Sequence, residues 1–110
     1  MSYLAKHLLQ PPAREEVDRL PGAAVLEFGA PWCSHCQGAQ PLIEQALRAR
    51  NEVAHLKIED GRGQRLGRSY GVKLWPTLVF LRNGQEIARL VRPQNAQAIA
   101  QALQQIAPAD

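Results

Sequence analysis

The chain has 110 residues, and its 13 lysines and arginines against 10 aspartates and glutamates give a net charge of +3 with neutral histidines. This length is typical of a single domain, here residues 1–110. A hydrophobic fraction of 45% excludes collagen-like and strongly disordered chains, and apolar runs such as residues 78–81 are far shorter than the roughly 20 residues of a membrane-spanning helix.

Residues 1–12 lack the apolar run and the small-residue cleavage site of a secretory signal. We therefore expect a cytoplasmic protein with no membrane partner. A mature exported form that begins with a new initiator methionine would have the same sequence, so export remains an alternative.

A short helix and a buried strand are predicted near the start of the chain. Pro12, followed closely by acidic residues, is typical of the first turn of a helix, here over residues 13–20. Residues 24–28 are rich in strand formers and predict a strand buried on both faces, with one acid, Glu27, inside it.

A long helix and a second strand follow. The helical pattern runs from Cys33 to Arg50, and Pro41 is expected to bend this helix rather than end it. Residues 53–58 predict the next strand. Because a helix-length connection separates the two strands, we expect them to be parallel in a βαβ unit.

The second half of the chain predicts a short helix, a β-hairpin and a final helix. The expected elements are a helix over 64–70, a strand over 77–81, a tight turn at Asn83-Gly84, a strand over 86–91 and a helix over 96–107 capped by Asn95. Together with the βαβ unit, these elements predict an α/β domain with helices on both faces of the sheet.

The two cysteines of the chain stand together as Cys33-Ser34-His35-Cys36, at the expected start of the long helix. Residues three apart on a helix are about 5–6 Å from each other, so this pair can form a disulfide without backbone movement. The helix N-terminus favours a thiolate at Cys33, which predicts that Cys33 attacks substrate disulfides. Cys36, a turn deeper and less exposed, is expected to resolve the mixed disulfide.

A metal site is the alternative use of the two sulfurs. Zinc usually needs further ligands, which only His7, His35 and His55 could supply, and none of them stands at a recognisable ligand spacing. We expect no metal in one chain, while a site shared by the cysteines of two chains stays open. His7 and His55 are expected to be structural or surface residues.

A nucleic-acid partner is not expected. Arg62, Arg65 and Arg68 form only a short arginine row, without the interleaved aromatic residues of a nucleic-acid surface. We interpret this row as a solvated helix face.

Residues 26–36, LEFGAPWCSHC, resemble the active-site segment of the thioredoxin superfamily. The resemblance extends to Pro41, Lys57, Trp75-Pro76-Thr77 and Asn83-Gly84, in the family's order and spacing. Within the superfamily, Glu27, Ala30-Pro31-Trp32 and His35 are more similar to protein disulfide isomerase domains, whereas the short chain is more like thioredoxin. The resemblance implies the thioredoxin fold, a central mixed β-sheet of four to five strands with helices on both faces. It leaves open whether residues 4–9 form the family's first edge strand or a helix.

The resemblance assigns Glu27 a role beneath the cysteines. An acid at this position relays a proton to or from Cys36 through water, with Lys57 as the neighbouring cation. A carboxyl group buried mainly by apolar walls should have a raised pKa. A purely structural ion pair between Glu27 and Lys57 is the alternative.

His35, between the cysteines, can stabilise the Cys33 thiolate, which would favour the dithiol over the disulfide and raise the reduction potential. The alternative is an exposed helix residue with little effect on sulfur.

The resemblance also implies a substrate-binding surface made of Trp32, Trp75, Pro76, Thr77 and Arg92. The Trp75–Pro76 bond is expected to be cis, with the Trp75 backbone ready to pair with an extended substrate segment. For both tryptophans, core packing is the alternative. Arg92 replaces a glycine common in the family, and could exclude partners, attract acidic segments or move toward Cys36. An exposed loop arginine is the alternative.

These features predict a monomeric thiol–disulfide oxidoreductase that needs no cofactor and cycles between the Cys33–Cys36 disulfide and dithiol. In the cytoplasm it would reduce disulfide-containing protein substrates, with electrons from a thioredoxin-reductase-like or thiol donor. A disulfide oxidase or isomerase is the alternative for an exported form. A binding or adaptor module without enzymatic activity is a further alternative.

Overall fold

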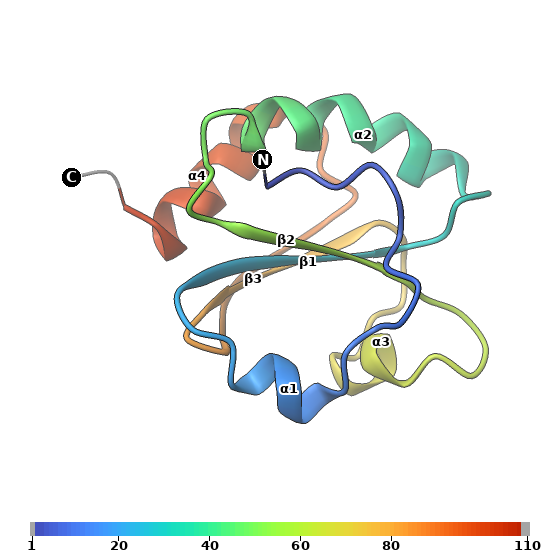
Figure 1. Ribbon diagram of the computed structural model, residues 1–110. Coiled ribbons are helices and arrows are strands. Elements are labelled where there is room, and N and C mark those ends of the chain that lie inside the picture. The colour runs from blue at the N-terminus through green and yellow to red at the C-terminus, as the bar shows by residue number, and fades with distance from the viewer. Residues whose placement is uncertain (1, 109–110) are drawn as a thin grey trace.

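The structure, a computed structural model, describes residues 2–108. Its elements in chain order are α1 (Arg14–Asp18), β1 (Ala23–Gly29), α2 (Ser34–Leu47), β2 (Ala54–Glu59), α3 (Arg65–Ser69), β3 (Thr77–Arg82), β4 (Gln85–Val91) and α4 (Ala96–Ile106). The strands form one sheet in the order β2-β1-β3-β4 (Figure 1). Strand β1 is parallel to β2 and antiparallel to β3, and β3 is antiparallel to β4. The predicted mixed sheet and its βαβ unit are confirmed.

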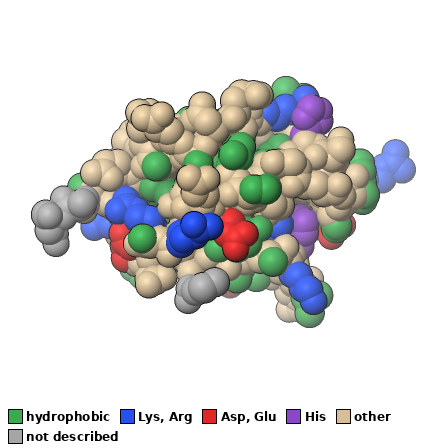
Figure 2. Space-filling model, turned by 90° about the horizontal axis from the view of Figure 1, so that it is seen from above, with side chains coloured by type: hydrophobic (Ala, Val, Ile, Leu, Met, Phe, Trp, Pro, Cys, Tyr) green, Lys and Arg blue, Asp and Glu red, His purple; other side chains and the backbone are tan. Residues whose placement is uncertain are grey.

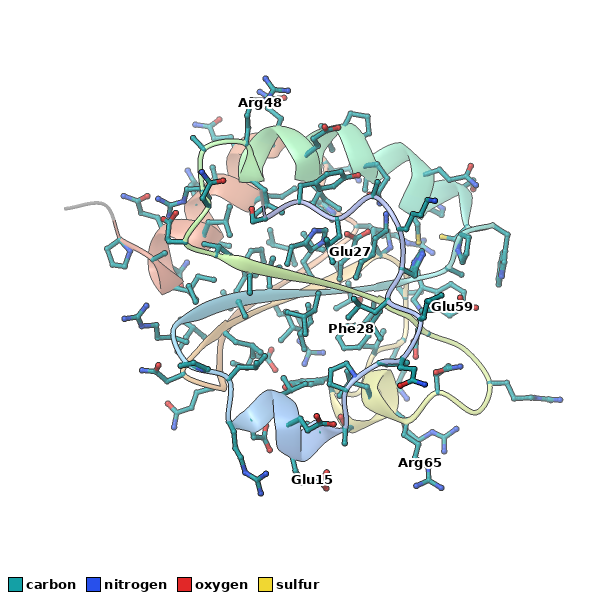
Figure 3. All side chains as sticks on the ribbon, viewed as in Figure 1. Glu15, Glu27, Phe28, Arg48, Glu59 and Arg65 are labelled. Carbon is teal, nitrogen blue, oxygen red and sulfur yellow. The ribbon has the colours of Figure 1, made fainter. Side chains whose placement is uncertain are left out.

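Helices cover both faces of this sheet, as predicted: α2 and α4 lie on one face, and α1 and α3 on the other (Figure 1). Strand β1 lies inside the sheet, and all its residues are buried. Val25 packs in the core beneath α2 and α4, whereas Leu26 and Phe28 pack in the core facing α1 and α3. Successive side chains of a strand point to opposite faces, so Glu27 points toward α2. Figure 3 shows Glu27 and Phe28 on these opposite sides of the sheet.

The four predicted helices are found, each with bounds that differ by at most three residues from the expectation. Helix α1 is shorter than predicted, because its last hydrogen-bonded turn closes at Arg19 and the chain then turns toward Pro21-Gly22. Helix α2 begins one residue after Cys33, which serves as its N-cap, and continues past Pro41 to Leu47. Helix α4 is capped as predicted, since the Asn95 side chain accepts the N–H of Ala98 at 2.8 Å.

The hairpin turn between β3 and β4 is also confirmed. Asn83 and Gly84 have positive φ angles of 51° and 80°, the conformation of a two-residue hairpin turn. The Asn83 side chain accepts the N–H of Gly22 at 2.8 Å, which ties this turn to the start of β1.

The N-terminal segment, residues 2–9, forms neither the edge strand nor the helix considered for it. It runs beside β2 and α2 (Figure 1), and it makes one backbone hydrogen bond to β2, from Leu8 N–H to the Lys57 carbonyl at 2.8 Å. Two further backbone groups, Leu4 N–H and the Ala5 carbonyl, are hydrogen-bonded to side chains of β2 instead. A regular ladder does not form because these groups are already occupied.

Candidate active site

The two cysteines lie at the junction of β1 and α2, where the first turn of the helix places one sulfur above the other. The Cys33 sulfur accepts the backbone N–H of Cys36 at 3.2 Å. Cys33 is 8% exposed and Cys36 3% exposed, so Cys36 is the deeper of the two, as predicted. Both sulfurs are thus nearly buried at the helix end, and Cys33 is the more accessible of the two.

Cys36 is held as a thiol by its surroundings. Burial raises its pKa to about 12, and the hydrogen bond with Cys33 and the negative charges of Cys33 and Glu27 act in the same direction. At neutral pH this sulfur therefore keeps its proton until another group accepts it.

Gly29, the last residue of β1, makes room for Cys36. A Cβ atom at this position would lie 2.5 Å from the Cys36 sulfur, too close for any side chain. The close approach of strand and helix at the site thus depends on glycine.

Glu27 has different partners from the one predicted. His55 Nε2 lies 2.9 Å from one carboxylate oxygen, and Gln40 Nε2 donates to the other at 2.7 Å. The predicted partner, Lys57, instead donates to the Ala5 carbonyl at 2.9 Å and to Gln40 Oε1 at 2.7 Å. The direct ion pair of Glu27 with Lys57, considered as the alternative, is therefore not formed: the Gln40 amide stands between the two charges, and Lys57 is the neighbouring cation whose charge lowers the pKa of Glu27.

The predicted raised pKa of Glu27 is also wrong. Burial does raise it, but the hydrogen bonds from His55 and Gln40 outweigh burial, together with the positive charges of His55, where it is protonated, and of Lys57, so the pKa lies below its ordinary value. The walls around this carboxyl group are polar donors and not apolar side chains, so Glu27 is a carboxylate at neutral pH.

His55 and Gln40 are the site residues that the sequence interpretation missed. His55 is buried, which corrects its assignment to the surface or to an unpartnered structural role. Both follow from regular spacing: His55 is two residues before Lys57, on the same face of β2, and Gln40 is one helical turn after Cys36. In the structure, the side chains of His55 and Gln40 both lie next to Glu27.

The two tryptophans lie side by side next to Cys33, on the face of the site that we call the outer side. Their rings are 5.5 Å apart in an edge-to-face arrangement, with Trp32 73% exposed. Trp75 packs against the cluster of Ala30 and the two cysteines, and its indole N–H donates to Asp60 at 2.8 Å. Core packing was the alternative for both tryptophans, and the exposure of Trp32 excludes it for that residue. The Trp75–Pro76 bond is cis, as predicted.

Arg92 is bound to the residues that precede β3. It has a positive φ of 51°, its backbone N–H donates to the Pro76 carbonyl at 2.9 Å, and its Nε donates to the Trp75 carbonyl at 2.8 Å. It is therefore neither a loosely exposed loop residue nor in contact with Cys36. Thr77 is buried, and its hydroxyl donates to the Leu74 carbonyl at 2.6 Å, so its side chain is not available to a substrate.

Two hollows flank the cysteines. A groove of about 350 Å³ lies on the Arg92 side, and it is lined by Ser34, His35, Gly38, Ala39, Leu42, Pro76, Arg92, Pro93 and Gln94. A cavity of about 350 Å³ on the opposite side is lined by Ala5, Lys6, His7, Ala30, Pro31, Cys36, Gln37, Gln40 and Lys57. We call these the outer groove and the inner cavity. Histidine side chains are visible at this end of the molecule in Figure 2.

His35 lies in the first turn of α2, is exposed and lines the outer groove. Within residues 2–108, no hydrogen bond joins it to either cysteine. The arginines at 62, 65 and 68 are exposed. In the same part of the chain, no three metal-ligating side chains are grouped, and no helix is long and apolar enough to cross a membrane.

Together, the fold and the paired cysteines define a thiol–disulfide oxidoreductase domain of the thioredoxin type. The sequence model of the thioredoxin family matches residues 12–105, and the chain belongs to that family. The predicted thioredoxin fold is confirmed by a solved structure, thioredoxin 2 from Pseudomonas aeruginosa PAO1 in its reduced form. That structure is 52% identical, covers 93% of this chain and 94% of its own, and has a TM-score of 0.83.

Two relatives show the breadth of the likeness. Human protein disulfide-isomerase A2 is 38% identical over 89% of this chain, which spans 19% of that protein. The thioredoxin-like protein slr0233 of Synechocystis is 31% identical over 76% of this chain and 81% of its own length. The chain thus spans about a fifth of the isomerase and most of the small thioredoxin-like protein.

Proposed function

We propose that this protein is a cytoplasmic, monomeric enzyme that reduces disulfides in protein substrates and is itself reduced by a thioredoxin-reductase-like enzyme or another thiol donor. The observation that carries the proposal is the asymmetry of the cysteines: both are nearly buried, but Cys33 is the more accessible of the two and packs with Trp75, whereas Cys36 is deeper and has a raised pKa. An attacking sulfur needs access, and a resolving sulfur must stay inactive until the mixed disulfide forms.

The exchange takes two steps. The Cys33 thiolate attacks one sulfur of the substrate disulfide, which forms a Cys33–substrate disulfide and releases the other substrate sulfur as a thiolate. Cys36 then loses its proton to a base and attacks the Cys33 sulfur, which releases the second substrate thiolate and leaves the Cys33–Cys36 disulfide. Two electrons pass to the substrate, and the donor dithiol returns them to the enzyme.

Glu27 is the base that the site offers for the second step. It is the buried carboxylate near Cys36, and its lowered pKa keeps it ionised at neutral pH. Proton transfer from Cys36 to this carboxylate needs a bridging water. The inner cavity has room for a water beside Cys36 and Gln40, and Gln40 is hydrogen-bonded to Glu27, although Glu27 itself does not line the cavity.

The outer groove is proposed to hold an extended substrate segment, with Trp32 and Trp75 supplying apolar contact next to Cys33. The Nε of Arg92 covers the Trp75 carbonyl, a backbone acceptor that an added strand would use. A substrate segment must pair with the Arg92 guanidinium or displace it. Acidic segments pair with the Arg92 guanidinium, because carboxylates form charge-assisted hydrogen bonds with guanidinium groups.

Disulfide oxidation or isomerisation is the second candidate, and His35 is the observation that favours it. An imidazole between the cysteines can stabilise the Cys33 thiolate, and hence the dithiol, which makes the disulfide a stronger oxidant. This activity would suit an exported protein.

The reduction potential of the Cys33–Cys36 pair separates the two candidates. It is measured by equilibrating the protein with glutathione buffers, alongside reduction of insulin disulfides. A potential near −270 mV, roughly that of thioredoxin, with rapid insulin reduction, supports the reductase; a potential near −180 mV, roughly that of protein disulfide isomerase, supports the second candidate. A folded protein that does not reduce insulin would favour a binding module. His35→Pro should lower the potential if His35 favours the dithiol.

A further inference from the structure

A buried pair of side chains, Glu27 and His55, lies on the inner side of the cysteines. The side chains are 1% and 0% exposed, and His55 Nε2 is 2.9 Å from Glu27 Oε1. They come from β1 and β2, which are neighbours in the sheet. Figure 3 shows Glu27 between the sheet and α2, with the N-terminal segment beside it. Burying a carboxylate without hydrogen-bond donors costs free energy. The effect of this contact therefore depends on whether the imidazole nitrogen next to Glu27 carries a proton.

The backbone of the N-terminal segment defines where that proton is. Leu4 N–H donates to His55 Nδ1 at 2.8 Å, so Nδ1 is an acceptor and carries no hydrogen. In a neutral imidazole the other nitrogen is then the donor, and Nε2–H points at the Glu27 carboxylate. A second proton on His55 would place an N–H group against the N–H of Leu4. His55 is thus restricted to giving one hydrogen bond to Glu27.

The second oxygen of Glu27 is oriented toward the helix that carries the cysteines. Gln40 Nε2 donates to this oxygen at 2.7 Å and also to the Cys36 carbonyl at 2.8 Å. The other end of the Gln40 amide accepts from Lys57 and from the Tyr3 hydroxyl, both at 2.7 Å. The amide orientation follows, because Lys57 can only donate. One oxygen of Glu27 therefore contacts His55, and the other is linked through the Gln40 side-chain nitrogen to the Cys36 carbonyl.

The N-terminal segment covers this arrangement and also bounds the inner cavity. The Tyr3 ring stacks on the His55 ring at 5.5 Å, and residues 5–7 line the cavity together with Cys36, Gln40 and Lys57. Because Leu4 N–H occupies Nδ1 of His55, the imidazole offers Glu27 a donor at Nε2 and no acceptor. The inner cavity, about 350 Å³ and lined by Cys36, is the route left for proton exchange with solvent.

We propose that His55 is a positioning residue for the resolving step: locked by Leu4 N–H as a donor, it holds Glu27 as a carboxylate facing Cys36, while protons leave through the inner cavity beneath residues 5–7. This inference rests on the proposed function of Cys36 as the resolving thiol. It makes the N-terminal segment part of the active site.

Other titratable groups surround the pair and must be considered in any pH profile. They come from the N-terminal segment, β2 and α2, and they are Tyr3, His7, Lys57, Glu59, Cys33, Cys36 and Glu44. The pKa of His7 is lowered, mainly by burial and also by Lys57. Variants that change only His55 or Leu4 leave these groups in place.

The first experiment follows the reduced protein mixed with excess dithiobis-nitrobenzoate, which releases one coloured thiolate when Cys33 attacks and a second when Cys36 resolves the adduct. His55→Leu removes the donor and should slow the second phase about tenfold at neutral pH, with its pH midpoint shifted upward, because the pKa of Glu27 rises. His55→Gln, whose amide can still donate, should stay within about threefold of the parent. The first phase should be unchanged in both variants.

The two phases separate the possible failures. If the unaltered protein shows no second phase, the proposed role of Cys36 fails. If the second phase is present but His55→Leu leaves its rate and pH midpoint unchanged, the role of His55 is overturned and that of Cys36 stands.

The second experiment tests whether Leu4 N–H fixes the tautomer of His55. It uses variants of Leu4 and therefore does not depend on the folding of His55→Leu. Leu4→Pro removes the N–H that occupies Nδ1, whereas Leu4→Ala keeps it. At neutral pH, nitrogen NMR should show the His55 proton on Nε2 in the parent and in Leu4→Ala, and a mixture of the two tautomers in Leu4→Pro. A parent protein with the same mixture of His55 tautomers as Leu4→Pro, or with the proton on Nδ1, would overturn the proposal.

Discussion

The outer and inner sides of the Cys33–Cys36 pair differ in how they are built. The outer side consists of Trp32, Trp75 and Arg92, which are at least partly exposed and lie in or next to recognisable motifs. The inner side consists of buried and partly buried polar groups from four separate segments: residues 2–9, β1, α2 and β2. The outer side can change with the substrate at small structural cost. The inner side cannot, because each buried polar group there depends on the others for its hydrogen bonds.

The cysteines themselves should give the largest difference between the two sides. Cys36→Ser leaves the outer sulfur free to attack but removes the inner one, so the mixed disulfide accumulates and turnover falls by at least about a thousandfold. Mass spectrometry of the protein after incubation with insulin measures the adduct. Cys33→Ser should form none. Sustained turnover by Cys36→Ser would contradict the division of roles.

The packing of β1 against Cys36 should respond strongly to one methyl group. Gly29→Ala places a Cβ atom within 2.5 Å of the Cys36 sulfur and should lower the free energy of unfolding by about 1–3 kcal/mol. Gly38→Ala is the matched control, because nothing lies within 4 Å of its Cβ position in α2. That variant should raise stability by about 0.5–1 kcal/mol. Urea denaturation of both reduced proteins measures the difference, and equal effects would show that the close approach is not required.

The inner carboxylate should make stability depend on pH. The pKa of Glu27 is lowered in the folded protein, so the unfolded chain binds its proton more readily. The free energy of unfolding should therefore fall as the pH drops from about 5 through the lowered pKa, and the stabilisation should be fully present above the unfolded value. Glu27→Gln should flatten this part of the curve, measured by urea denaturation at a series of pH values. An unchanged slope would assign the dependence to other acids.

The outer side should show the smallest structural effect and a change in substrate preference. Arg92→Gly relieves a positive φ but frees the Trp75 carbonyl, and these opposing effects, each about 1 kcal/mol, should leave stability nearly unchanged. The preference for a disulfide peptide with glutamates near its cysteine over the same peptide with glutamines should fall about fivefold.

The control for this variant is Arg48→Gln, which removes one positive charge from the far end of α2 (Figure 3). It should keep the preference for the acidic peptide. If both variants lose this preference equally, net charge and not the position of Arg92 selects the substrate.

Much of the fold could be predicted because each element carries its own local signal. The run of strand formers in residues 24–28, the asparagine and glycine of the hairpin and the cap at Asn95 act over a few residues, and each was found where expected. The segment before Ala13 could not be predicted, since its backbone groups bind side chains that lie about 50 residues away in the sequence.

The sequence by itself determined the chemistry of the site: two cysteines one helical turn apart after a buried strand, with an acid beneath them. Only the tertiary structure decided the state of that acid. From the apolar strand alone, burial is the one effect that can be foreseen, and it predicts a raised pKa for Glu27. The fold brings Gln40 and His55 within hydrogen-bond distance of the carboxyl group, and the pKa is lowered instead. The balance between desolvation and donors depends on distances of about 3 Å between segments, which sequence spacing does not specify.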